Sequence, residues 1–178
     1  MSVKIGYIVG SISSSSINRQ VFEATKQLVP AGAELIEIPI ADLPMYSPDW
    51  DANYPDSARE YKAAISNVDT VIVATPQYND SLSGVLKNAL DWASRPWGQH
   101  SFANKPVAVA SASIASHGGA KAGGFVADIL AFGQAKVLET QINVFVNEET
   151  FDASGAFAQL ALVSETTEFL NTVVANAK

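Results

Sequence analysis

The 178-residue chain contains no cysteine, which excludes disulfides, cysteine-zinc sites and thiol redox chemistry. A reducing compartment, the cytoplasm, is therefore the expected location. Basic clusters are also missing, because no two Lys or Arg residues adjoin and the net charge is −7. An acidic chain without basic patches is a poor partner for nucleic-acid phosphates and for an anionic membrane surface. We expect neither partner.

Long apolar runs are absent as well. No stretch approaches about 20 consecutive apolar residues, so no membrane span is predicted. The opening "MSVKIGYIV" has a short apolar run without a small-residue cleavage site, and it is typical of a first strand rather than a signal sequence. With 48% hydrophobic and 16% charged residues, the chain has a globular composition, and its length favours a single domain over residues 1–178.

Strand-like and helix-like patterns alternate about five times. The apolar runs at 3–9, 70–75 and 105–113 are nearly continuous, as in parallel strands covered on both faces. Segments such as 16–29 between them have helical spacing. This alternation predicts a doubly wound α/β sandwich with right-handed crossovers. The length favours a flavodoxin-like three-layer sandwich with a five-stranded parallel sheet in the order 2-1-3-4-5.

Three polar loops follow the first, third and fourth predicted strands. They are "GSISSSSIN" (10–18), "PQYNDS" (76–81) and "SASIASHGG" (111–119), here named the first, second and third loops. All three are rich in small, hydroxyl and amide residues. In open α/β sheets, ligands bind outside the carboxyl ends of the strands, near the switch in strand order. The sequence therefore predicts a ligand site where these loops meet.

The first loop has the features of an anion site. A helix beginning near Ser16 would present unpaired N–H groups and the positive end of its dipole to a phosphate. Serine hydroxyls and the Asn18 amide would add donors, but the loop contains no Lys or Arg, so the cradle is neutral. Neither a Walker A motif nor GxGxxG is present. The alternative is a flexible serine turn in which Ser15 or Ser16 caps the helix.

The first loop together with "PQYNDSLSGVLKNALDWASRP" (76–96) resembles the NAD(P)H-dependent FMN reductase family, which includes bacterial quinone, chromate and azo-dye reductases. That family reads roughly G-S-x-R-x-x-S-x-N and then P-E-Y-N-x-S-x-P-G-x-L-K-N-A-x-D-W. The resemblance implies a flavodoxin-like fold, FMN as cofactor and NADPH or NADH as electron donor. It also implies hydride transfer to FMN and then electron transfer to a quinone, azo, metal-oxyanion or flavin acceptor.

The resemblance further implies which residues contact the cofactor. The first loop would hold the phosphate, the second would wrap the flavin ring largely through main-chain groups, and the third would border the flavin from the other side. No catalytic side chain and no metal ligand is expected, because such chemistry depends on positioning. The implied cofactor-binding residues are Ser11, Ser13, Ser16, Ile17, Asn18, Pro76, Gln77, Tyr78, Asn79, Ser113 and Gly118.

The chain departs from the family pattern at four positions. Ser13 stands where the family usually has Arg, and since a charge-assisted hydrogen bond is roughly twice as strong as a neutral one, weaker FMN retention is predicted. Gln77 replaces Glu with similar reach and no charge. Ser83 replaces Pro before Gly84, a change expected to matter little. His117 precedes the third-loop glycines where the family tends to be apolar, and its effect stays open.

Other functions are less well supported. "SHGG" (116–119) resembles a hydrolase oxyanion loop, but there is no G-x-S-x-G elbow, and neither His100 nor His117 has a second metal ligand at suitable spacing. A flavodoxin-like electron carrier without NAD(P)H activity and a reductase that uses FMN as a loosely bound substrate both stay open. Trp92 and Trp97 suit either core packing or a subunit interface. The family resemblance implies a homodimer or a dimer of dimers.

Overall fold

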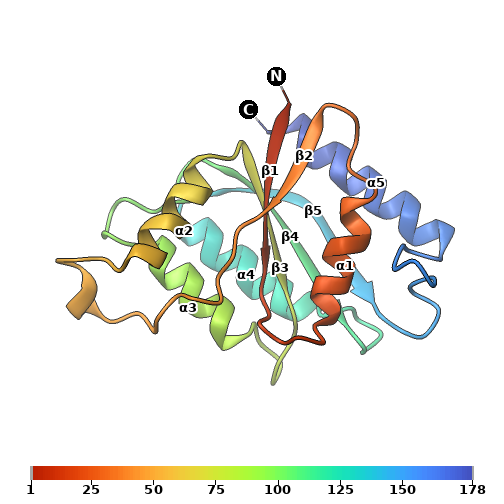
Figure 1. Ribbon diagram of the computed structural model, residues 1–178, viewed down its shortest axis with the longest axis horizontal. Coiled ribbons are helices and arrows are strands. Elements are labelled where there is room, and N and C mark those ends of the chain that lie inside the picture. Colours follow the sequence, from red (N-terminus) through yellow and green to blue (C-terminus); the bar gives the residue numbers. More distant parts are fainter. Residues whose placement is uncertain (1, 178) are drawn as a thin grey trace.

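A computed structural model describes residues 2–177, in which one parallel sheet lies between two layers of helices (Figure 1). No helix in this range is long and apolar enough to cross a bilayer. The strands are β1 (Val3–Val9), β2 (Ala33–Glu37), β3 (Thr70–Thr75), β4 (Pro106–Ser113) and β5 (Lys136–Phe145). The helices are α1 (Ile17–Lys26), a 3-10 turn (Pro48–Trp50), α2 (Asp56–Ser66), α3 (Gly84–Ala93), α4 (Ala120–Phe132) and α5 (Leu160–Ala175).

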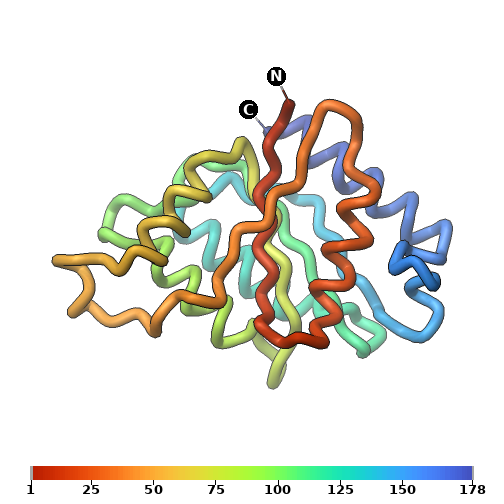
Figure 2. Tube along the Cα trace, viewed as in Figure 1, coloured from red at the N-terminus to blue at the C-terminus, as the bar shows by residue number. Residues whose placement is uncertain are grey.

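The sheet has the order β2-β1-β3-β4-β5 with all neighbours parallel, which confirms the predicted fold. β1 is flanked by β2 and β3, with Ile5 paired to Leu35 on one side and to Thr70 on the other. The loops that follow β1, β3 and β4 lie together at the lower edge in Figures 1 and 2, and the two chain ends lie at the opposite edge. This arrangement brings the first, second and third loops to one place.

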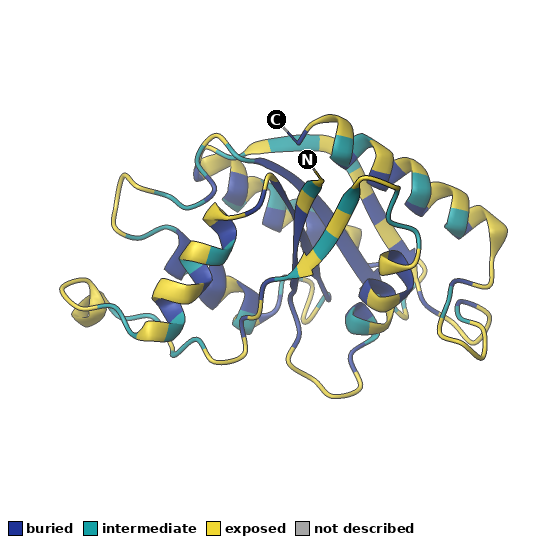
Figure 3. Cartoon of the chain, turned by 45° about the horizontal axis from the view of Figure 1, so that its top comes forward, coloured by how far each residue is buried: buried dark blue, intermediate teal, exposed yellow. Residues whose placement is uncertain are grey.

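The central strands β1, β3 and β4 are mostly buried on both faces, and a core on each face holds the sheet between the helical layers. α1 and α5 pack on one core, where Tyr7 lies against Phe22 with ring centroids 4.7 Å apart. α2, α3 and α4 pack on the other core. Every residue of β3 is buried, as its continuous apolar run predicts, and Figure 3 shows burial concentrated in the strands and on the inner sides of the helices. Rigid strands thus carry the loops.

Polar side chains of α3 secure an irregular segment, residues 39–55. Asn88 accepts a hydrogen bond from the Tyr46 N–H at 2.8 Å, and Trp92 Nε1 donates to the Pro44 carbonyl at 2.8 Å. Trp92 is fully buried, so it is a core residue. Trp97 is 74% exposed, so core packing does not account for it.

Candidate functional site

The three loops surround an open cleft of about 370 Å³ at the carboxyl edge of the sheet. Nine predicted cofactor residues line it, whereas Asn79 and Gly118 do not. Ser15, Ala112 and Ile114 also line it, although they are not among the cofactor-binding residues that the family resemblance implies. None of these lining side chains carries a charge at neutral pH. The full lining is Ser11, Ser13, Ser15, Ser16, Ile17, Asn18, Pro76, Gln77, Tyr78, Ala112, Ser113 and Ile114.

The first loop presents free hydrogen-bond donors at the start of α1. Ser16 is the N-cap, and its Oγ accepts from the Arg19 N–H at 3.3 Å, so the expected capping role is present. The N–H groups of Ile17 and Asn18 donate to no acceptor within residues 2–177. Ser11 Oγ, like Ser16 Oγ, accepts a hydrogen bond, in this case from the Ser13 N–H. The Ser11 hydroxyl proton is therefore free to donate. These groups suit an anion at a helix N-terminus.

Asn18 is a structural link as well as a lining residue. It is 1% exposed, and its Nδ2 donates to the Ala112 carbonyl at 3.1 Å, tying α1 to the end of β4. One of the two side-chain N–H groups that the sequence suggested for a phosphate is therefore already engaged. The main-chain N–H of Asn18 has no acceptor within residues 2–177 and is available.

Arg19, a cation close to the first loop, is directed to a carboxylate. Arg19 makes a two-bond ion pair with Glu37 at 2.8 and 2.6 Å, and this hydrogen bonding holds the pKa of Glu37 below its ordinary value. Arg19 lines a neighbouring hollow with Ser14 and Glu37, which shares Ser11 and Ser13 with the cleft, but Arg19 does not line the cleft itself. The cleft itself is therefore neutral at the end where a phosphate would bind.

The second loop is a tight hairpin turn. Tyr78 and Ser81 exchange two main-chain hydrogen bonds of 2.9 and 3.0 Å. The two residues between them, Asn79 and Asp80, have φ values of 48° and 65°, as a type I′ turn requires. Asn79 therefore lies at the turn tip, away from the cleft lining, while Tyr78 stays half-exposed on the cleft wall. The N–H groups of Gln77 and Asn79 find no acceptor within residues 2–177.

The third loop is held from behind by β5. Gly118 has φ 59°, and a Cβ at this position would lie 2.5 Å from the Asn143 carbonyl oxygen, so only glycine fits. The Ser111 hydroxyl lies 2.8 Å from the Gly118 carbonyl and 2.7 Å from Asn143 Oδ1. Gly118 thus supports the cleft without lining it. His117 Nδ1 accepts from the Gly119 N–H at 3.1 Å, a local bond within the loop.

Ser83 contradicts its expected minor role. Its side chain is 1% exposed, donates to the Gly10 carbonyl at 2.6 Å and accepts from the Leu86 N–H at 3.3 Å. It therefore caps α3 and joins that helix to the end of β1. Proline, the family residue, has no group that makes either bond. The expectation that this replacement matters little is wrong.

This arrangement fits FMN in its chemistry. Orphan N–H groups and hydroxyls lie at the α1 end, and an amphipathic tyrosine wall and further orphan N–H groups lie at the second loop. Among residues 2–177 there is no group of three or more His, Asp or Glu side chains placed to hold a metal ion. The profile of the family described as "NADPH-dependent FMN reductase" matches residues 3–149.

The chain belongs to the NADPH-dependent FMN reductase family. A 2-hydroxy-1,4-benzoquinone reductase from Burkholderia sp. is 39% identical over 157 residues, which are 87% of this chain and 85% of that protein. An NAD(P)H-dependent FMN reductase from Pseudomonas aeruginosa is 34% identical over 155 residues, covering 86% and 83% of the two chains. The solved structure of FerB, a flavoenzyme NAD(P)H:(acceptor) oxidoreductase from Paracoccus denitrificans, has a TM-score of 0.92 at 29% identity, covering 98% and 97%.

Membership of the FMN reductase family confirms the resemblance seen in the sequence, the predicted fold, and the predicted use of FMN and NAD(P)H. Residue by residue, the cofactor contacts are a proposal that the geometry supports to different degrees. Ser11, Ser16, Ile17 and the Asn18 main chain offer free donors, whereas Asn79 lies at the turn tip and Gly118 supports the third loop, and neither lines the cleft. Sequence patterns could not separate these roles, because the turn and strand contacts that decide them are set in three dimensions.

Proposed function

We propose that the protein is an NAD(P)H-dependent FMN oxidoreductase that delivers electrons to a small acceptor of the quinone class. The observation that carries this proposal is the open, uncharged cleft with free main-chain donors at both ends. The named activities of the FMN reductase and quinone reductase relatives support the donor and the acceptor class.

The two ends of the cleft would bind different parts of the flavin. The Ile17 and Asn18 N–H groups and the Ser11 and Ser16 hydroxyls would receive the phosphate, assisted by the dipole of α1. The Gln77 N–H group would meet the polar edge of the ring, and Tyr78 would pack beside it. FMN, when bound, supplies the hydride and electron chemistry.

The cleft residues position reactants and do not exchange protons. Tyr78 is the one ionisable side chain that lines it. An acceptor would therefore be placed by contact with the exposed cleft wall, where Tyr78 is 53% and Ile114 is 77% exposed. A planar, largely apolar acceptor such as a quinone matches that wall.

Flavin bleaching tests the reductase proposal. The protein is loaded with FMN under anaerobic conditions, and NADPH or NADH is added in separate experiments. We expect the yellow absorbance to fall with at least one nucleotide and to return when benzoquinone is added. Persistence of the yellow band with both nucleotides would overturn the proposal and favour the electron-carrier alternative.

The neutral phosphate end specifically favours a second candidate, in which FMN is a loosely bound substrate. No lining side chain supplies the positive charge that a phosphate would use. Dialysis of FMN-loaded protein distinguishes the two cases. Retention of about one FMN per chain fits a resident cofactor, whereas loss of the flavin combined with NAD(P)H-driven reduction of added free FMN fits a substrate.

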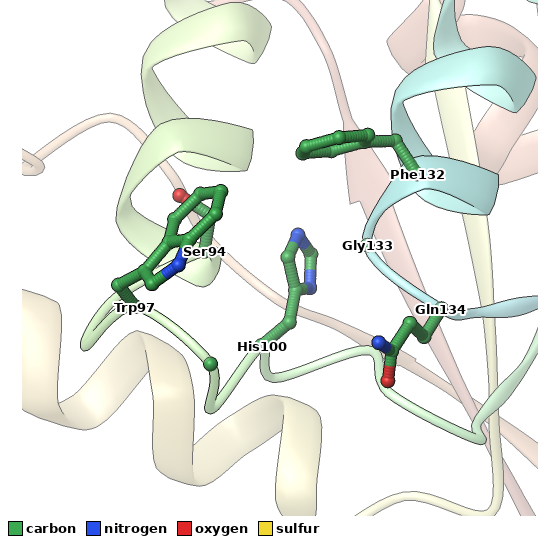
Figure 4. A pocket seen from close by; sticks show the side chains of 7 residues that line it. Ser94, Trp97, His100, Phe132, Gly133 and Gln134 are labelled. Carbon is green, nitrogen blue, oxygen red and sulfur yellow. The ribbon is translucent and has the colours of Figure 1, made fainter.

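We infer a homodimer, or a dimer of dimers, that uses the outer surface of α3 and α4. Trp97 and Phe132 are 74% and 75% exposed, and their ring centroids lie 6.3 Å apart. They border a hollow of about 300 Å³ with His100 between them, as Figure 4 shows. Exposed aromatic pairs of this kind are enriched at subunit interfaces.

A cytoplasmic location is also part of the proposal. A chain without cysteine forms no disulfides, so an oxidising compartment gives it no added stability, and NAD(P)H is a cytoplasmic reductant. Fractionation of cells that produce the tagged chain tests this, and recovery in any other fraction would contradict it.

A further inference from the structure

The N-terminus of α4 lacks a cap from its own sequence. Gly119 is the N-cap residue and has no side chain, so it makes no capping bond. The N–H of Ala122, in the first turn, donates instead to Gln77 Oε1 at 3.3 Å. Gln77 belongs to the second loop, so a residue from the cleft wall caps a helix that begins at the third loop.

The same Gln77 carboxamide also faces a carboxylate. Its Nε2 donates to Asp80 Oδ1 at 3.0 Å, within the hairpin turn. A carboxamide accepts through oxygen and donates through nitrogen, so one side chain serves both partners. The glutamate usual in the family could accept from Ala122, but it could not donate to Asp80. Gln77 and Asp80 are thus chemically matched.

Lys121 completes the connection from the side of the helix. Its ammonium pairs with Asp80 Oδ2, so a residue in the first turn of α4 contacts a residue of the second loop. This contact holds the pKa of the Asp80 carboxyl below its ordinary value, with a smaller contribution from His117. Gly119 suits this position because its φ is 87°, where side chains other than glycine are strained, and because a Cβ there would lie 3.2 Å from the Ser111 Cβ.

We propose that Gln77, Asp80 and Lys121 form a clasp that holds the second loop against the first turn of α4 and thereby positions the loop N–H groups facing the flavin ring. The flavin contact rests on the proposed function, whereas the clasp itself exists in the protein without cofactor. Asn79 and Asp80 occupy the left-handed backbone region, which non-glycine residues keep only when surrounding contacts hold them there. The clasp supplies such contacts, and its three members are positioning residues.

Two substitutions separate the parts of the clasp. Lys121→Met removes the cation and leaves the turn sequence intact, so we expect FMN affinity to fall about two- to fivefold, as for loss of an exposed ion pair. Gln77→Glu removes the donor and places two carboxylates together, so we expect FMN affinity to fall roughly tenfold.

Two further variants are controls. Lys121→Arg preserves the charge and should retain wild-type affinity. Lys26→Met, at the far end of α1, is the matched control for charge and should have no effect.

Hydrogen exchange in the protein without FMN provides an independent measurement. The hydrogen-bonded N–H groups of Tyr78, Ser81 and Ala122 should exchange faster in Lys121→Met and Gln77→Glu than in wild type, while those of α1 and β3 should not. The midpoint potential of bound FMN should shift in the same two variants and stay unchanged in Lys121→Arg and Lys26→Met. A purely structural role would lower stability without moving this potential.

The outcomes distinguish the clasp from the enzyme activity. Wild-type exchange and wild-type FMN potential in both clasp variants would overturn the clasp, even if the protein bleaches with NAD(P)H. Accelerated exchange confined to the N–H groups of Tyr78, Ser81 and Ala122, in a protein that fails to bleach, would support the clasp and overturn the reductase proposal.

Discussion

At Ser13 this chain lacks the positive charge that the family pattern usually has in the first loop. No lining side chain of the cleft provides a cation, so a phosphate would be held by neutral donors alone. Ser13→Arg would convert one of them into a charge-assisted contact. We expect about tenfold tighter FMN binding, measured by equilibrium quenching of FMN fluorescence.

The neighbouring serine provides the control for this change. Ser14 lines the hollow beside Arg19 and Glu37 and does not line the cleft. Ser14→Arg therefore adds the same charge to the same loop without a direct phosphate contact. Equal gains from both variants would show a general charge effect, and no gain from Ser13→Arg would show that the neutral cradle does not limit affinity.

Glu37 makes a pH-dependent contribution at the residue scale. Its hydrogen bonds to Arg19 lower its pKa in the folded protein, so the stabilisation is present above the ordinary value of 4.5 and is lost as pH falls through the lower folded value. Both side chains are about one-third exposed, which limits the effect to under about 1 kcal/mol. Urea unfolding of Glu37→Gln and wild type should differ at pH 7 and converge in acid. A constant difference across this range would contradict the assignment.

At the scale of elements, side chains link each loop to a neighbouring strand or helix before any ligand binds. Asn18 ties α1 to β4, Ser83 ties α3 to the end of β1, and Gln77 ties the second loop to α4. Such links reduce the ordering that a ligand would otherwise have to induce. The cleft is therefore largely preformed.

Ser83→Ala tests one of these links. The substitution removes the cap of α3 and leaves the buried Gly10 carbonyl without its partner, so we expect a loss of about 2 kcal/mol in the free energy of unfolding. Urea unfolding provides the measurement. Ser66→Ala, which alters an exposed hydroxyl at the end of α2, should change stability by less than about 0.5 kcal/mol. Equal losses in the two variants would contradict the role given to Ser83.

The elements were predictable from sequence because their signals are local. Buried strands such as 70–75 are continuous apolar runs, and parallel order brings their carboxyl ends together. The contacts of Ser83, Asp80 and Lys121 were not predictable, because each joins segments far apart in the chain. Asn79 was placed on the cleft by its motif, but the type I′ turn carries it to the tip.

At the scale of the whole molecule, the cleft and the exposed aromatic pair are two separate surfaces. The cleft lies at the carboxyl edge of the sheet, whereas Trp97 and Phe132 lie on the outer side of the α3–α4 layer. Arg95 lies near both Tyr46 and Trp97, with its guanidinium 4.9 and 5.7 Å from their ring centroids. Arg95 thus packs against the Trp97 ring, while the exposed sides of Trp97 and Phe132 are available to a second subunit.

Replacing the aromatic pair tests the proposed assembly. We expect wild type to sediment as a dimer or a dimer of dimers at micromolar concentration, and Trp97→Ser combined with Phe132→Ser to sediment as a smaller species with unchanged secondary structure. Both side chains are about three-quarters exposed in the single chain, so their loss should cost it little folding stability.

Leu160→Ser is the control for this test. It removes an 86% exposed apolar side chain from α5, on the other face of the sheet, and should leave the assembly intact. A monomeric wild type, or a double variant that sediments as wild type does, would refute the interface, because the exposed rings are the observation on which it depends.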